Sequence, residues 1–188
     1  MRLTKITTRN GDQGKTKLAQ GDSVYKNELI INAIGDIDEL NSVLGVCISC
    51  YKKEGLWRFC NDKNIINEIK NIQNDLFNIG GEISLNDSSK NLLKDDSLSF
   101  LDNRIKELNA SLEPLEEFIL PGGDSFSSNL HLARAIARRS ERSIVDLYIK
   151  DLENNNIVKY LNRLSDYLFV LSRFYNKNNN IDENMWKK

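Results

Sequence analysis

Long apolar stripes dominate this sequence, and only two prolines interrupt it. Both of them, Pro114 and Pro121, lie in one short stretch of the chain. Elsewhere apolar residues recur at intervals of three and four, the spacing that places them on one face of an α-helix. This pattern predicts five helices, over residues 36–51, 64–83, 96–112, 124–152 and 156–175. Asp124 or Ser125 is the expected N-cap of the fourth.

The connections between these segments are polar or contain proline and glycine, as loops do. Five long helices with short to moderate connections favour an all-α fold, a five-helix antiparallel bundle. We expect the 188 residues to form a single domain. Residues 1–27 would form an N-terminal arm outside the bundle, and residues 177–188, which begin rich in asparagine, a loose C-terminal tail.

The composition argues against several classes of function. Lys and Arg number 26 against 27 Asp and Glu, so a net charge of -1 creates no field that attracts nucleic acid or a membrane surface. The chain shows no apolar run near the roughly 18 residues of a membrane span, and no secretory leader. An odd number of cysteines, three, indicates a reducing compartment, and we expect a cytoplasmic protein.

The cysteines and the single histidine do not favour a metal site. Cys47 and Cys50 form a C-x-x-C pair inside a helical segment with no second pair, which predicts reduced structural thiols. A di-iron bundle needs glutamates combined with E-x-x-H motifs on two helices. The only histidine is His131, and the residue three before it is Ser128, so this class is excluded.

The stretch NGDQGKTKL, residues 10–18, contains the G-K-T of a phosphate-binding loop without its context. A P-loop requires a glycine five residues before the Gly-Lys pair, and that position, counted back from Gly14, is Arg9. No helix is expected to begin at Thr16, because a glycine and an Asp-Ser pair follow. What remains is either a basic, glycine-rich loop that binds an anion through N–H and ammonium groups, or a solvated arm.

The segment LHLARAIARRSER places arginines on the fourth predicted helix at a regular spacing. Arg134, Arg138 and Arg142 are four residues apart, and Glu141 follows the same slowly drifting face. Guanidinium groups bind oxyanions in a bidentate way, so this stripe is a candidate phosphate clamp. The alternative is a solvated face or a set of ion pairs between helices.

Three further positions do not follow from bundle packing alone. Asp38 falls in the first turns of the first helix and is a candidate partner for one of the arginines, whereas Asp36 suits a capping role better. Asn162 stands among apolar residues of the fifth helix and needs either buried partners or a ligand. Phe118, in FILPGGDS, belongs either to a loop packed into the core or to one that lines a large apolar cofactor.

Five stretches, in order, resemble those of the ATP:cob(I)alamin adenosyltransferases of the propanediol-utilisation and human mitochondrial type. They are TTRNGDQGKT with Lys26 after it, AIGDIDELNSVLG, FILPGG, LHLARAIARRSER and YLNRLSDYLFVLSRFYN. The resemblance implies a homotrimer with active sites between neighbouring subunits. It implies a transferase that moves the 5′-deoxyadenosyl group of ATP to the cobalt of cob(I)alamin, uses Mg²⁺ and releases triphosphate. A reductase and an adenosylcobalamin-dependent enzyme would be its partners.

The resemblance also implies roles for individual residues. Asp38 and Arg134 would form an ion pair between subunits, and Phe118 would displace the lower axial ligand of cobalamin. Arg138 would take part in catalysis as well as in binding. The ATP-binding residues would be Thr8, Arg9, Asn10, Gly11, Thr16, Lys17, Lys26, Arg138, Arg139, Ser140, Glu141, Arg142 and Asn162.

The chain departs from the commonest pattern of that family at three positions. Gln13 stands where lysine is frequent, Ser140 where alanine is usual, and Asp124 where a hydroxyl residue is more usual. Gln13 and Asp124 alter the charge of the two loops and so bear on affinity, not on the reaction class. The alternative functions are a carrier or sensor that binds the same ligands without turnover, and a purely structural helical scaffold.

Overall fold

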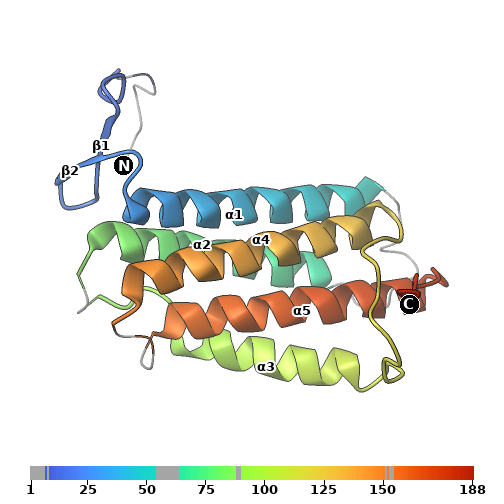
Figure 1. Ribbon diagram of the computed structural model, residues 1–188. Coiled ribbons are helices and arrows are strands. Elements are labelled where there is room, and N and C mark those ends of the chain that lie inside the picture. Colours follow the sequence, from blue (N-terminus) through green and yellow to red (C-terminus); the bar gives the residue numbers. More distant parts are fainter. Residues whose placement is uncertain (1–6, 8, 54–63, 88–89, 151, 153–154) are drawn as a thin grey trace.

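The computed structural model describes residues 7, 9–53, 64–87, 90–150, 152 and 155–188. Figure 1 shows an elongated bundle of helices with a small hairpin at one end. The elements are β1 (Lys15–Lys17), β2 (Ser23–Tyr25), α1 (Leu29–Lys53), α2 (Ile65–Leu85), α3 (Asp95–Asn109), α4 (Ser125–Tyr148) and α5 (Asn156–Asn178). Across the described residues, the prediction of an all-α bundle of five helices is confirmed, with one two-stranded sheet in addition.

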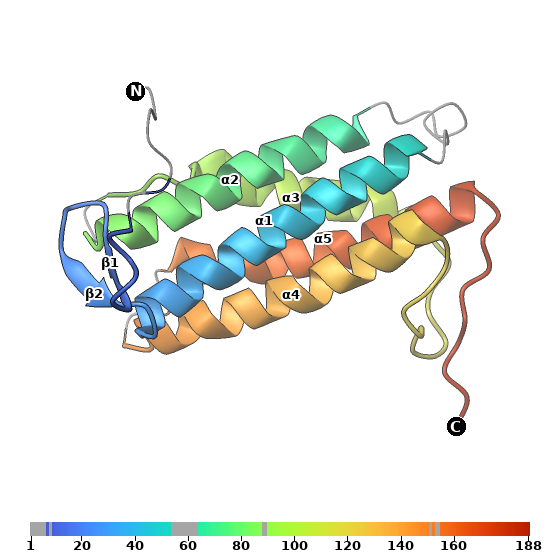
Figure 2. The same cartoon turned by 90° about the horizontal axis from the view of Figure 1, so that it is seen from above.

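The helices pack side by side. α1 contacts α2 and α4, α4 contacts α5, and α5 also contacts α3. Helices α2 and α4 run antiparallel to α1, and α5 runs antiparallel to α4 (Figures 1 and 2). One end of the bundle therefore carries the start of α1 with the ends of α2 and α4. The opposite end carries the start of α4 and the end of α5 (Figure 1).

The apolar stripes predicted from the spacing face the inside of the bundle. Leu40, Leu44, Ile69, Ile72 and Leu76 are among the side chains that are almost fully buried. Burial of each such side chain contributes about 1.5–3 kcal/mol relative to leaving it exposed. Apolar burial is therefore the main force that holds α1 and α2 together.

Helix α5 buries three tyrosines, and each hydroxyl donates to a carboxylate of another element. The pairs are Tyr160 with Asp75 (3.1 Å), Tyr167 with Glu68 (2.8 Å) and Tyr175 with Asp124 (2.6 Å). A buried phenol needs such a partner, because an unpaired polar group is unfavourable away from water. Burial, reinforced by Asp75, raises the pKa of Tyr160 well above its usual value.

Several helix boundaries differ from the prediction. Helix α1 begins at Leu29 rather than at residue 36, because Ile30 and Ala33 extend the buried stripe upstream. The expectation that Asp36 and Asp38 lie in its first turns is therefore wrong. Farther along the chain, α2 ends at residue 85 rather than 83 and α3 at 109 rather than 112. Helix α4 ends at residue 148 rather than 152, and α5 continues to residue 178 rather than 175.

The N-cap predicted for the fourth helix is confirmed at Asp124. Its Oδ1 accepts the backbone N–H of Ser127 at 2.9 Å. Gly123 has a φ of +106°, and a Cβ at that position would lie 2.2 Å from Oγ of Ser127. The Pro-Gly-Gly turn therefore requires glycine here, since only glycine adopts this conformation readily and leaves room for the Ser127 hydroxyl.

Cys47 is buried on α1, and burial, together with the nearby Cys50, raises the pKa of its thiol to about 12. Such a thiol stays protonated near neutral pH, as a structural cysteine does. Cys60 lies outside the described residues. Among the described residues, no group of three or more His, Cys, Asp and Glu side chains is arranged to hold a metal ion. None of the described helices is long and apolar enough to cross a membrane.

Candidate functional site

The N-terminal arm is a β-hairpin at the end of the bundle where α1 begins (Figures 1 and 2). β1 pairs antiparallel with β2, with Thr16 opposite Val24, which confirms that no helix begins at Thr16. Leu18, after β1, is buried. The N–H of Ala19 donates to the carbonyl and hydroxyl oxygens of Ser84, at 3.1 and 3.0 Å. The hairpin is therefore anchored to the end of α2.

A glycine turn and a lysine of the arm meet where the hairpin closes. The N–H of Lys26 donates to the carbonyl of Gly14 at 2.9 Å. A Cβ at Gly11 would lie 2.8 Å from Nζ of Lys26, so the amine lies directly against this glycine. The structure thus brings together Gly11 and Lys26, two of the residues predicted to bind ATP.

The remaining predicted residues of the arm face outward. Arg9, Asn10 and Lys17 are exposed, and Thr16 is half-buried. Arg9 has a φ of 60°, a conformation uncommon for a residue with a side chain, and it stands just before the turn. Thr8 lies outside the described residues.

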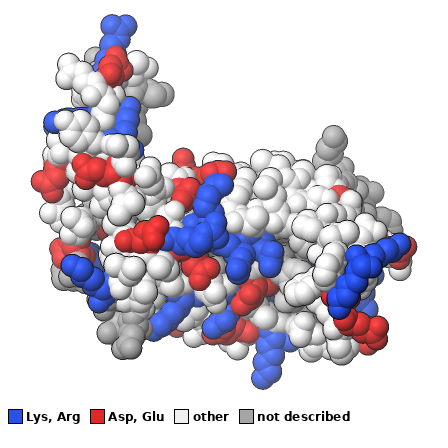
Figure 3. Space-filling model, viewed as in Figure 1, with Lys and Arg blue, Asp and Glu red and all other residues white. Residues whose placement is uncertain are grey.

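Helix α4 carries the arginine stripe along one side of the bundle, and Figure 3 shows Lys and Arg side chains gathered over it. Arg138 and Arg142 are exposed, and Nη1 of Arg142 donates to the carbonyl of Arg138 at 2.9 Å. Within the described part of the chain, neither guanidinium has an acidic ion-pair partner. Two positive charges one helical turn apart are therefore available to an anion.

Glu141 and Asn162 lie beside these arginines, on adjoining faces of α4 and α5. Nδ2 of Asn162 donates to Oε1 of Glu141 at 3.1 Å. Arg134, one turn before Arg138, is half-buried, and its guanidinium lies over the ring of Phe169, 5.4 Å from the centroid. Four predicted site residues, Arg138, Glu141, Arg142 and Asn162, are thus gathered in one region.

Arg139 and Ser140 point elsewhere, toward α1. Arg139 forms ion pairs with Asp36, at 3.2 Å, and with Glu39. The hydrogen bond that Arg139 donates to the Glu39 carboxylate raises the pKa of the Arg139 guanidinium. Ser140 is buried, and its hydroxyl donates to the carbonyls of Asp36 and Ile136, at 3.0 and 3.1 Å. The interpretation of Asp36 as a cap is wrong, because Asp36 joins α1 to α4, and the Ser140 hydroxyl is engaged inside the bundle.

Asp38, predicted to pair with an arginine, is exposed on α1. Among the described residues of this single chain, no ion pair joins Asp38 to Arg134, and the α1 carboxylates that pair with α4 are Asp36 and Glu39, both through Arg139. An ion pair between Asp38 and Arg134 therefore requires a second copy of the chain.

The segment that joins α3 to α4, residues 110–124, lies at the end of the bundle opposite the arm and contains Phe118 (Figures 1 and 2). Phe118 is 75% exposed, so of the two alternatives for this residue the loop packed into the core is wrong. The 25 residues of α1, about 37 Å of helix, separate the two ends. The structure therefore does not bring Phe118 and the arm together within one chain.

The C-terminal tail is not loose, contrary to the prediction from its composition. The N–H of Leu120 donates to the carbonyl of Asn184 at 2.8 Å, and the N–H of Trp186 donates to the carbonyl of Phe118 at 2.7 Å. Ile119 and Met185 form an antiparallel bridge between these bonds. The Trp186 ring lies edge-on to Phe118, with centroids 6.3 Å apart. Sequence reasoning missed this pairing, although two adjacent apolar residues in a polar tail were a signal for it.

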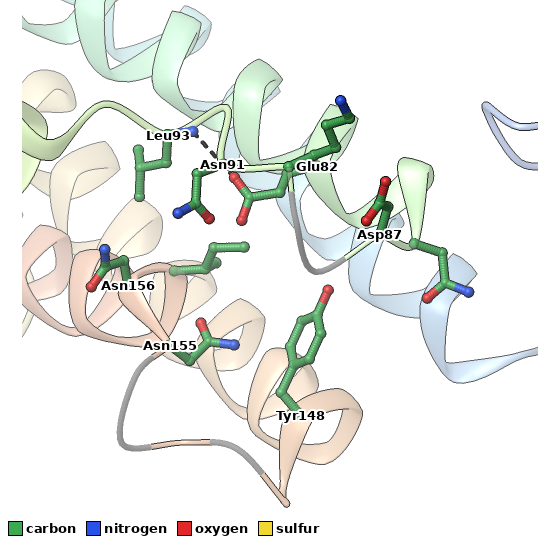
Figure 4. Close-up of a pocket in the computed structure, with 10 residues that line it drawn as sticks. Glu82, Asp87, Asn91, Leu93, Tyr148, Asn155 and Asn156 are labelled. Atoms are coloured by element: carbon green, nitrogen blue, oxygen red, sulfur yellow. Dashed lines mark hydrogen bonds between the residues drawn. The ribbon is translucent and has the colours of Figure 1, made fainter.

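A polar cavity of about 390 Å³ lies at the arm's end of the bundle, between the ends of α2 and α4 and the start of α5 (Figure 4). Glu82 accepts the N–H groups of Leu92 and Leu93 there, at 2.8 and 3.2 Å. Burial, and then the charge of Glu82, raises the pKa of Tyr148 in its wall. Of the predicted site residues that the structure describes, none lines this cavity.

Comparison with known proteins assigns the fold and motifs to one family. The model of a family described as cobalamin adenosyltransferase matches residues 6–175. The chain belongs to the cobalamin adenosyltransferase family. A curated cobalamin adenosyltransferase of Cupriavidus metallidurans is 41% identical over 187 residues, which cover 100% of this chain and 96% of that protein.

Two further relatives agree with the resemblance stated from the sequence. The human corrinoid adenosyltransferase MMAB is 33% identical over 180 residues, which cover 92% of this chain and 69% of the human protein. A solved structure of a PduO-type ATP:corrinoid adenosyltransferase from Lactobacillus reuteri has a TM-score of 0.83 and 31% identity, and the match covers 98% of this chain and 100% of that chain. That protein, a phenylalanine-to-alanine variant, is complexed with cobalamin and ATP. As a cobalamin adenosyltransferase, this chain is an enzyme of the transferase class.

Proposed function

We propose that this corrinoid adenosyltransferase grips the triphosphate of ATP with the N-terminal arm and the arginine stripe of α4. The observation that carries the proposal is the exposed pair Arg138 and Arg142, which has no acidic partner in the described chain. Guanidinium groups at this spacing can bind successive phosphates through bidentate hydrogen bonds. Arg139 is assigned to stability, because the carboxylates of α1 already match its charge.

The reaction joins the cobalt of cob(I)alamin to C5′ of ATP. The electron pair of Co(I) forms the Co–C5′ bond while the bond from C5′ to the triphosphate oxygen breaks, and triphosphate leaves with that bonding pair. Cobalt is the nucleophile, so the protein needs no serine, cysteine or histidine base. The protein aligns C5′ with cobalt and stabilises the charge that gathers on triphosphate, with Arg138, Arg142 and Lys26 as the cations.

The arm contributes backbone donors and an ammonium group. Gly11 has no side chain to hold the Lys26 amine away, so a phosphate at this turn meets N–H groups and the amine together. The resemblance adds Thr8, Arg9, Asn10, Thr16 and Lys17 to the binding residues. The hairpin is anchored through Ala19 to Ser84, which limits the freedom that binding must remove.

Mg²⁺ would be held largely by phosphate oxygens, because this ion binds through one or two carboxylates plus substrate phosphates. Glu141 and Asn162 fit that requirement. Their hydrogen bond uses one carboxylate oxygen and the amide nitrogen, which leaves one carboxylate oxygen and one amide oxygen as hard ligands. The ion would lower the negative charge that the arginines face.

The complete site is proposed to form between copies of the chain in a homotrimer. Phe118 and the arm stand at opposite ends of one bundle, so the corrinoid end of one copy must meet the nucleotide end of another. Asp38 is exposed and Arg134 half-buried, and within the described chain no carboxylate pairs with Arg134. An ion pair between Asp38 of one copy and Arg134 of another would set the two halves in register.

The exposed apolar side chains around Phe118 are proposed to face the corrinoid. Phe118, Leu120, Met185 and Trp186 are all substantially exposed at one place on the molecule. A phenyl ring in the place of the lower axial ligand leaves Co(II) four-coordinate, and such an ion accepts the electron that makes Co(I) more readily. In the PduO-type relative solved with cobalamin and ATP, a phenylalanine is the residue replaced by alanine, which supports the choice of a phenylalanine, Phe118, for this role.

An anaerobic assay of the purified protein tests the function. Cob(I)alamin, ATP and Mg²⁺ are mixed with the protein, and the cob(I)alamin absorption band and the released triphosphate are followed. We expect the band to disappear and triphosphate to appear in equal molar amount. If ATP raises the melting temperature but the cob(I)alamin band persists, the protein is a binding protein without turnover and the proposal is wrong.

A further inference from the structure

The exposed apolar side chains of Phe118, Leu120, Met185 and Trp186, here called the Phe118 wall, have little support from the hydrophobic core. Its backbone is held by two hydrogen bonds between the segments 118–120 and 184–186, both of which lie outside the helices. Short pairs of strands are marginally stable on their own in water. Something in the bundle must therefore hold both segments in place.

Arg173 on α5 contacts, with one guanidinium, the stretches of chain that lead into these two segments. Its Nε lies 3.3 Å from each carboxylate oxygen of Glu183, directly before the paired part of the tail. Its Nη2 donates to the carbonyl of Glu113 at 3.1 Å, in the segment that leads to Phe118. Arg173 thus ties the Phe118 segment and the tail to the same point of one rigid helix.

The surroundings of Arg173 make this contact strong. Arg173 is only 8% exposed, and the Glu183 side chain is mostly buried as well. An ion pair shielded from water is weakened little by salt, and removal of one partner leaves a buried charge uncompensated. A planar guanidinium donates in two directions at once, which the single ammonium group of a lysine does less well.

We propose that Arg173 is a positioning residue that holds the Phe118 wall against the corrinoid by clamping the loop and the tail together. Arg173 itself does not touch the substrate. The ion pair between Lys188 and Glu117, 3.0 Å apart, also joins the tail to the Phe118 loop. Because the Lys188 side chain is exposed, water and salt weaken this pair more than the pair between Arg173 and Glu183. The inference rests on the proposed function only where it assigns Phe118 to the corrinoid.

Glu183→Gln tests the clamp without disturbing the bundle, because Glu183 belongs to the tail. Asp182→Asn is the matched control, since it removes the same charge at the neighbouring exposed position. Hydrogen exchange of the full-length protein without ligands should show the Leu120 and Trp186 amides exchanging about tenfold faster in Glu183→Gln, and unchanged in Asp182→Asn. Arg173→Lys should behave like Glu183→Gln.

The second readout is the spectrum of the four-coordinate Co(II) corrinoid formed with ATP bound. Glu183→Gln should lose most of this signal and show a lower kcat with an unchanged KM for ATP, because the nucleotide site lies at the other end of the bundle. Equal exchange in Glu183→Gln and wild type would overturn the inference. So would faster exchange with an unchanged Co(II) signal. If the wild type itself transfers no adenosyl group, the proposed function fails, while the exchange rates still report whether Arg173 clamps the two segments.

Discussion

Asn162 on α5 donates from Nδ2 to Oε1 of Glu141 on α4, at 3.1 Å, and so fixes the carboxylate that stands within the arginine stripe. Asn162→Ala should free Glu141 and raise the KM for ATP about tenfold, the effect of losing one hydrogen bond to a charged group. The melting temperature should change little. Steady-state kinetics check this, with Asn103→Ala, an exposed asparagine of α3, as the control. An unchanged KM in Asn162→Ala would remove both residues from the proposed site.

Replacement of the neighbouring arginines Arg138 and Arg139 of α4 should affect different properties, turnover in one case and stability in the other. Arg138→Ala should reduce turnover by at least about 100-fold, as expected when one charge-stabilising donor is lost, with an unchanged melting temperature. Arg139→Ala should instead destabilise the protein by about 1 kcal/mol, since its partly exposed ion pairs join α4 to α1.

Adenosyl transfer and urea unfolding are the measurements for both arginine variants. Equal turnover in Arg138→Ala and wild type would contradict the assignment of this residue. A large loss of stability in Arg138→Ala would show instead that its guanidinium is structural.

Phe118 and Phe77 have nearly equal exposed fractions and provide a matched pair for substitution. Phe118 is 75% exposed near the tail, and Phe77 is 73% exposed on α2. Phe118→Ala should lower kcat for adenosyl transfer about 10- to 100-fold, because most of the phenyl surface is left exposed to bury apolar area against the corrinoid. Phe77→Ala should leave kcat unchanged. Similar activities of the two variants would argue against a role for Phe118 in the reaction.

Gly123 and Gly80 should respond in opposite directions to alanine. Gly123→Ala places a Cβ 2.2 Å from Oγ of Ser127 at a φ of +106°, and should destabilise the protein by about 1–3 kcal/mol. Gly80 lies inside α2 with no atom within 4 Å of an added Cβ, so Gly80→Ala should stabilise by about 0.5–1 kcal/mol. Urea unfolding curves measure both changes. A neutral Gly123→Ala variant would mean that the turn before α4 adapts.

Stability should fall on mild acidification because of His131. Burial, and then the charge of Arg134, lowers the pKa of this imidazole below its ordinary 6.5. The unfolded state therefore binds a proton before the folded state does, so the stabilisation is complete above pH 6.5 and is lost as pH falls through the lowered pKa. Urea unfolding at pH 7.5 and pH 5.5 should show a smaller loss in His131→Gln than in the wild type. Identical losses would assign the effect to other groups.

Much of the fold could be predicted because it depends on local patterns. Apolar residues at intervals of three and four gave the five helices, and Asp124 before a helix gave a cap that the structure confirms. The start of α1 was placed too late because Gly35, followed by Asp36 and Asp38, has the pattern of a helix start, although the apolar residues 29–31 precede it. The pairing of the tail with residues 118–120 was missed because two short segments far apart in the sequence leave little periodic signal.

The sequence by itself determined the helical architecture and the set of residues that carry the family's motifs. Only the tertiary structure decided which of those residues remain available to ligands. Arg138 and Arg139 are adjacent in sequence, but they point about 100° apart around the helix, so Arg139 meets the carboxylates of α1 while Arg138 faces solvent. The tertiary structure also decided that the segment with Phe118 and the arm lie at opposite ends of the bundle. Whether a carboxylate neutralises an arginine, and how far apart two motifs lie, depends on how the helices pack in space. The spacing of residues along the chain does not contain that information.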